Sequence, residues 1–105
     1  VLREVADICR AVSRKADVAA RYGGEEIMIL LPETSRERAA KLAERVRRRI
    51  AGHAVPYDGR EISVTVSAGV AELAAADRDV DAFIARADEA LYRAKDEGRN
   101  RVVLS

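Results

Sequence analysis

Two glycines and two glutamates in a row, Gly23, Gly24, Glu25 and Glu26, are the residues whose types and spacing best suit chemistry. The flanking segments 17–22 and 26–31 read as short strands, which places these residues at the turn of a predicted hairpin. Glycine allows the positive φ angles of a tight turn and lets a ligand approach the backbone. Adjacent carboxylates repel each other unless a cation lies beside them, and Mg²⁺ is usually held by carboxylates together with substrate phosphates. The turn therefore indicates either a phosphate site assisted by Mg²⁺ or a surface hairpin with solvated acids.

Two further motifs flank this hairpin in the sequence. Arg14 and Asp17 stand three residues apart just before it, and Lys95 and Arg99 stand four apart near the chain end. An Arg fork can hold a phosphate or a guanine edge, while a carboxylate can accept guanine N–H donors. Each pair is a weak signal on its own, because 35% of the residues are charged. Cations such as Lys95 and Arg99 at the end of a predicted helix are also ordinary partners of the helix dipole.

Taken together, the three motifs resemble the GGDEF domain of bacterial diguanylate cyclases. These signal-transduction enzymes condense two GTP molecules into cyclic di-GMP, and the resemblance runs over essentially all 105 residues. In that chemistry the 3′-hydroxyl of one GTP attacks the α-phosphate of the other while Mg²⁺ neutralises the developing charge. The resemblance implies that Glu25 and Glu26 are catalytic, that Glu25 is a metal ligand, and that Gly23 and Gly24 let the nucleotide lie against the hairpin.

The resemblance also implies two anion sites. Lys95 and Arg99 match residues that hold the triphosphate of GTP. Arg14 and Asp17 match the RxxD motif of a product-inhibition site for cyclic di-GMP, and Arg45 matches a further arginine of that site. Arg45 belongs to an arginine-rich face of the predicted helix that ends at Gly52, for which a solvated face is the alternative.

The start of the chain departs from the family pattern. The sequence opens with Val1 and Leu2 in what resembles the family's second helix, without an initiator Met. The resemblance places a metal-binding Asp on a preceding strand, and an Asn and an Asp that hold guanine on the helix after it. We therefore expect residues 1–105 to be a single, partial GGDEF domain that lacks the first strand and helix and does not turn over GTP by itself.

Partners follow from the same resemblance. Each domain of this family binds one GTP, so a homodimer is implied for catalysis, and an upstream sensory or receiver domain is expected in the parent protein. The alternative function is a catalytically silent GGDEF module that binds cyclic di-GMP and passes the signal to a partner domain.

The apolar periodicity predicts the elements that position these residues. A helix over 1–13 is followed by the hairpin, whose second arm is nearly all apolar and suits a buried strand. A capping box from Thr34 to Glu37 begins a helix that ends at Gly52, and Asp58 and Gly59 mark a hairpin turn before a strand over 62–70. A helix over 80–97 and a strand over 101–104 follow. This order predicts an α+β fold with helices on a mostly antiparallel sheet, similar to the ferredoxin-like palm of nucleotidyl cyclases.

Composition excludes several classes of protein. The net charge is +1 and the aromatic residues are three Tyr and one Phe, which argues against a nucleic-acid partner. No apolar run approaches the roughly 20 residues that span a bilayer, and no signal-peptide pattern opens the chain, so we expect a cytoplasmic domain without a membrane segment. The single Cys9 lies on the apolar side of the first predicted helix, which predicts a buried thiol.

Overall fold

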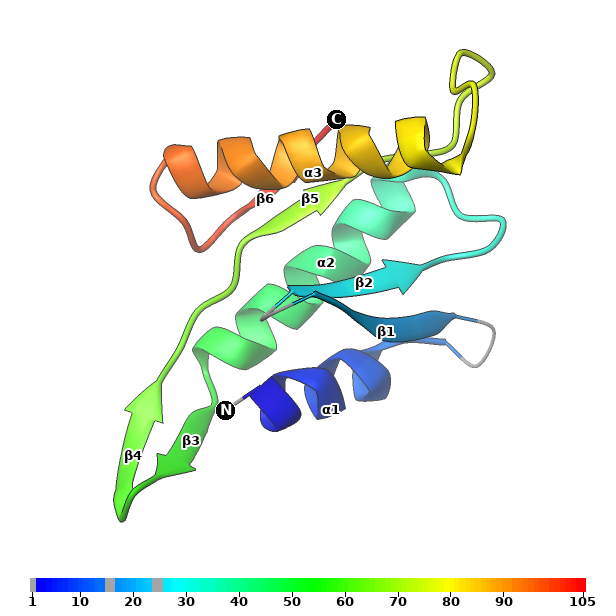
Figure 1. Ribbon diagram of the computed structural model, residues 1–105. Coiled ribbons are helices and arrows are strands. Elements are labelled where there is room, and N and C mark those ends of the chain that lie inside the picture. The colour runs from blue at the N-terminus through cyan, green and yellow to red at the C-terminus, as the bar shows by residue number, and fades with distance from the viewer. Residues whose placement is uncertain (1, 15–16, 24–25) are drawn as a thin grey trace.

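Along the described residues 2–14, 17–23 and 26–105 of this computed structural model, helices and short strands alternate in the predicted order (Figure 1). The first helix, α1 (Leu2–Val12), packs on α2 (Arg36–Ala51). Cys9 and Val12 of α1 are buried in one cluster with Val46 and Ile50 of α2. The apolar stripes of both helices and the buried thiol are therefore confirmed.

The first hairpin joins β1 (Val18–Gly23) to β2 (Glu26–Leu30) in antiparallel register, from the pair Val18 and Leu30 to the pair Gly23 and Glu26. The predicted tight-turn role of Gly23 is wrong. Gly23 is a strand residue, and its φ lies outside the positive range that Gly59 and Gly98 adopt. The register leaves Gly24 and Glu25 to connect the strands, and both lie outside the described residues.

The prediction that the second arm is buried on both faces is also wrong. Ile27 and Ile29 pack against the cluster of α1 and α2, whereas Met28 and Leu30 are 37% and 52% exposed. The hairpin is a two-stranded sheet, and alternate side chains of a strand point to opposite faces. One face therefore meets the core while the other is exposed.

The second helix begins one residue later than the capping box predicted. Ser35, not Thr34, is the N-cap, and its hydroxyl accepts from the backbone N–H of Arg38 at 3.3 Å. Gly52 ends the helix as predicted. The hydroxyl of Thr34 therefore does not cap this helix and can form other hydrogen bonds.

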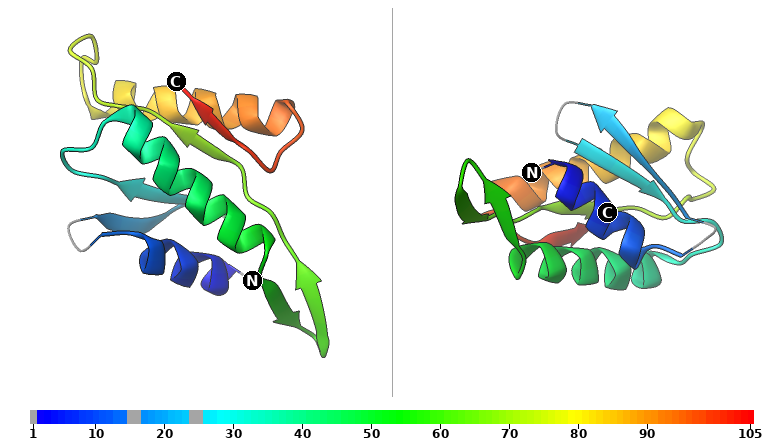
Figure 2. Two further views of the ribbon diagram at one scale, coloured as in Figure 1. Left: turned by 180° about the vertical axis from the view of Figure 1, so that it is seen from behind. Right: turned by 90° about the horizontal axis from the view of Figure 1, so that it is seen from below.

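The second hairpin, β3 (Ala54–Tyr57) and β4 (Arg60–Ser63), turns at Asp58 and Gly59 with φ angles of 50° and 75°. Two successive positive φ angles match the favoured two-residue hairpin turn. The hairpin projects from the rest of the molecule in every view (Figures 1 and 2).

The predicted strand over 62–70 is interrupted. β4 ends at Ser63, residues 64–67 join no ladder among the described residues, and β5 (Ala68–Val70) follows. Val64 and Val66 nevertheless pack against the core, so the alternation correctly predicted which side chains face inward. A ladder also needs a partner strand, and alternation alone carries no information about one.

The last helix, α3 (Val80–Asp96), connects β5 to β6 (Val102–Leu104), and these two strands pair in parallel. Parallel neighbours need such a crossover connection. Both α2 and α3 contact β5 and β6, so the strand pair lies between two helices (Figure 2). The α+β class is confirmed. No helix in the described ranges is long and apolar enough to cross a membrane.

Candidate functional site

The start of β2 lies beside the end of α3. Nζ of Lys95, in the last turn of α3, is 3.6 Å from Oε2 of Glu26, the first residue of β2. Both side chains are more than a third exposed, so the pair adds little to stability. Its significance is geometric, because two predicted site residues from distant parts of the sequence meet at one place with access to solvent.

Arg99 lies in the turn that follows α3. Its φ is 65°, its backbone N–H donates to the carbonyl of Ala94 at 2.9 Å, and the residue is exposed. No described contact joins its side chain to Glu26 or Lys95. The structure therefore brings Glu26 and Lys95 together and leaves Arg99 as a nearby exposed cation on the same helix end.

Arg14 and Asp17 form a closed ion pair between α1 and β1. The carboxylate of Asp17 accepts from the backbone N–H of Arg14 at 2.8 Å, from its Nε at 3.3 Å and from its Nη2 at 3.1 Å. The Asp17 side chain is fully covered, while the Arg14 side chain is 52% exposed. Asp17 thus holds the arginine in place, and its carboxylate is covered, so the predicted contact with guanine requires that carboxylate to become accessible.

The ion pair perturbs both groups. Hydrogen bonding from the Arg14 guanidinium lowers the pKa of Asp17, and the carboxylate in turn raises the pKa of Arg14. A carboxyl whose folded-state pKa is depressed stabilises the fold above its ordinary pKa. That contribution is lost as the pH falls through the lowered value, so the pair is intact at neutral pH.

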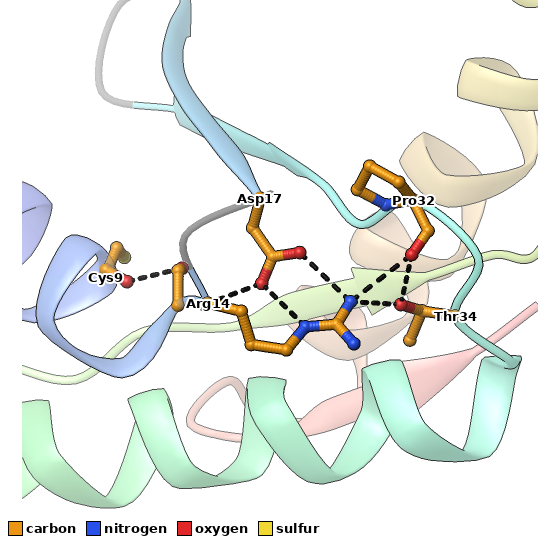
Figure 3. A network of polar contacts seen from close by, with 6 residues as sticks. Cys9, Arg14, Asp17, Pro32 and Thr34 are labelled. Carbon is orange, nitrogen blue, oxygen red and sulfur yellow. Dashed lines mark hydrogen bonds and ion pairs between the residues drawn. The ribbon is translucent and has the colours of Figure 1, made fainter.

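Two residues beyond β2 complete this network (Figure 3). Nη2 of Arg14 also donates to the carbonyl of Pro32 at 3.3 Å and to Oγ1 of Thr34 at 2.5 Å. The hydroxyl of Thr34 donates to Pro32 at 2.9 Å. Thr34 is the site residue that sequence reasoning missed, because no local pattern predicts a contact across 20 residues.

Arg45 lies apart from this network on the exposed face of α2. It stands nine residues beyond Arg36, which is about 14 Å along a helix. It lines a shallow hollow of about 430 Å³ with Lys41, Glu44, Arg48 and Arg49. No described contact connects Arg45 to Arg14 or Asp17.

The described residues do not fit a metal site by themselves. No group of three His, Cys, Asp or Glu side chains gathers in the part of the chain that the structure describes. Glu26 is the described carboxylate at the hairpin tip, and Glu25, the predicted metal ligand, lies outside the described residues. The Mg²⁺ predicted from the sequence therefore stays a prediction, and we assign no chemical step to it.

Residues 1–101 match the family model described as "Diguanylate cyclase, GGDEF domain". The chain belongs to the GGDEF family. The signature of this GGDEF domain reads Gly-Gly-Glu-Glu-Ile over residues 23–27.

Similar proteins agree with this assignment. The GGDEF domain is 46% identical over 105 residues to Diguanylate cyclase A of Treponema denticola, covering the whole chain and 28% of the relative. Its structure matches that of diguanylate cyclase SiaD from Pseudomonas aeruginosa, solved with its activator SiaC, with a TM-score of 0.92 and 36% identity over 99% of this chain and 40% of SiaD. It also matches the GGDEF domain of DgcB from Caulobacter crescentus, solved with cyclic di-GMP, with a TM-score of 0.90 and 32% identity over 98% of this chain and 61% of that one.

Proposed function

We propose that this GGDEF domain is the nucleotide-binding part of a diguanylate cyclase and carries a separate site for cyclic di-GMP. The contact between Lys95 and Glu26 is the observation that carries the proposal, because it puts a cation beside the carboxylate-bearing hairpin. Its relatives' names and the DgcB complex with cyclic di-GMP support the same assignment. Cytoplasmic GTP is the proposed substrate.

The residues at the hairpin tip have complementary roles in this proposal. In the free domain the ammonium of Lys95 faces Glu26, and on binding it would turn to the triphosphate, whose charge it offsets. Arg99 supplies a second exposed cation at the same helix end. Gly23 contributes open space, since no described atom beyond its chain neighbours lies within 4 Å of where its side chain would begin. Gly24, Glu25 and Glu26 complete the proposed site.

The reaction forms two phosphodiester bonds between two GTP molecules. Each 3′-hydroxyl oxygen forms a bond to the α-phosphorus of the other GTP, pyrophosphate leaves, and the hydroxyl proton passes to a base, for which a hairpin carboxylate is suited. Since one domain holds one GTP, we propose a homodimer with the two hairpins face to face.

The 105-residue chain alone should not form cyclic di-GMP from GTP and Mg²⁺. Its described residues gather no metal-binding group, and Mg²⁺ is usually held by one or two protein carboxylates together with substrate phosphates, so we expect Mg²⁺ to bind weakly to this chain. Product can be followed by chromatography over a range of chain concentrations. Steady product formation would contradict this expectation and would show that two copies complete the site.

Cyclic di-GMP, in contrast, should bind to the chain, and calorimetry can measure this binding. Cyclic di-AMP should not compete with cyclic di-GMP for the site. The basis is the Arg14 and Asp17 pair, which is fully formed in the free chain. Absence of cyclic di-GMP binding by a folded chain would refute the proposed product site.

The silent-module alternative is favoured by the contrast between the Arg14 network, which is formed, and the described residues, which gather no metal-binding group. GTP binding separates the two functions. A cyclase domain should bind GTP less well after Lys95→Ala, whereas a silent module that binds only cyclic di-GMP should show no GTP binding for that variant to weaken.

A further inference from the structure

The guanidinium of Arg14 is only partly used by the protein. Arginine carries five N–H donors in a rigid plane. Nε and one hydrogen of Nη2 serve Asp17, and the second hydrogen of Nη2 faces Thr34 and Pro32. No described residue accepts from Nη1, which points away from the network in Figure 3. The two donors of Nη1 are therefore available to a ligand while every existing bond is kept.

We propose that Thr34 is a positioning residue of the cyclic di-GMP site, acting through Arg14; this inference rests on the proposed function. Asp17 alone fixes one edge of the guanidinium from only three residues away, so the pair could still swing as a unit. Thr34 reaches the same group from a different segment, where the carbonyl of Pro32 accepts a second, longer hydrogen bond, and these contacts block that motion.

Thr34 is itself well anchored for this role. Its hydroxyl accepts from Arg14 and donates to the carbonyl of Pro32 at 2.9 Å, so its single proton has a fixed direction. The next residue, Ser35, caps α2 and holds the backbone at the start of that helix. Arg14 is thereby attached to the beginning of α2 as well as to β1.

The energetic consequence is preorganisation. Binding normally costs the rotamer freedom of each long side chain that it immobilises, typically enough to change affinity several-fold. In this domain the freedom of Arg14 is already lost on folding. A phosphate or guanine edge that accepts from Nη1 would meet a group that is held in place and half exposed.

The test compares Thr34→Val, which removes the hydroxyl at nearly constant size, with Thr34→Ser, which keeps it. Cyclic di-GMP affinity measured by calorimetry should fall about three- to tenfold for Thr34→Val and stay near that of the parent chain for Thr34→Ser. Thr65→Val is the matched control, because Thr65 is exposed in the segment that joins β4 to β5. Denaturant unfolding of each variant reports any loss of stability separately.

Nuclear magnetic relaxation of the Arg14 Nε–H group gives a readout that needs no ligand. It should show added motion of the Arg14 side chain in Thr34→Val and none in Thr34→Ser. If the valine variant folds poorly, Thr34→Ala replaces it in both measurements. Failure of the unaltered chain to bind cyclic di-GMP would refute the proposed function. Equal or tighter binding by Thr34→Val, with normal binding by the unaltered chain, would refute only the positioning role.

Discussion

Replacing Gly69 with alanine should destabilise the domain by about 3 kcal/mol, the upper end of the range for overpacked cores. A Cβ at this position would lie 2.2 Å from the carbonyl oxygen of Ala87 and 2.3 Å from the backbone nitrogen of Leu91. Both atoms belong to the backbone of α3, so no side chain can rotate to relieve the clash. Either α3 moves away from β5 or the strand shifts, and each change disturbs the packing of α3 on the parallel strand pair.

Urea unfolding followed by circular dichroism measures this effect. Gly23→Ala is the matched control, because the added methyl group meets no described atom beyond the chain neighbours within 4 Å and the φ of Gly23 is not positive. That variant should stay within about 0.5 kcal/mol of the unaltered chain. Equal stability of the two variants would mean that α3 does not approach β5 as closely as the structure shows.

Arg14→Ala should reduce the affinity for cyclic di-GMP by roughly ten- to a hundredfold, the loss expected when a ligand hydrogen bond to a charged group is removed. The variant removes the Nη1 donors and leaves the covered carboxylate of Asp17 without its guanidinium partner. Calorimetric titration at pH 7 is the measurement. Arg14→Lys should restore little of the lost affinity, since an ammonium cannot reproduce the planar fork of the guanidinium.

Arg10→Ala provides the control for this experiment. Arg10 also pairs with an aspartate three residues away, Asp7, at 3.4 Å, but both side chains are 64% exposed on α1. Removing that surface pair should leave affinity and stability nearly unchanged. Unchanged binding by Arg14→Ala in a folded sample would show that cyclic di-GMP does not use this arginine.

The sequence predicted those parts of the fold that depend on local patterns. The stripe that contains Cys9 and the stripe that ends at Ile50 follow helical periodicity, and both helices have the expected faces. Asp58 and Gly59 predicted their turn because two residues with positive φ suffice to define it. The break at residues 64–67 could not be predicted in this way, because strand alternation describes burial and not the presence of a neighbouring strand.

In the site, too, local sequence patterns carry no information about contacts between distant segments. Arg14 and Asp17 were predicted as two groups that contact a ligand, and the structure shows that they also bond to each other, a local contact across three residues. Only the family resemblance placed Lys95 and Glu26 in one site, where the structure shows them in contact. Neither a local sequence pattern nor the resemblance predicted the contact of Thr34 with Arg14. A glycine inside a strand can mark close backbone approach, but which helix comes near Gly69 depends on the tertiary fold.

Among the described residues, the three strand pairs share no ladder hydrogen bonds with one another, so we do not expect the backbone to be protected as a single unit. β5 and β6 lie between two helices, and their amides should exchange with solvent only when most of the fold opens. The β3 and β4 hairpin projects outward with Val55 as its one fully buried large side chain, so we expect its amides to exchange by local opening while the remainder stays folded. The expected protection from exchange is thus graded, from a firmly held strand pair to an arm that opens independently.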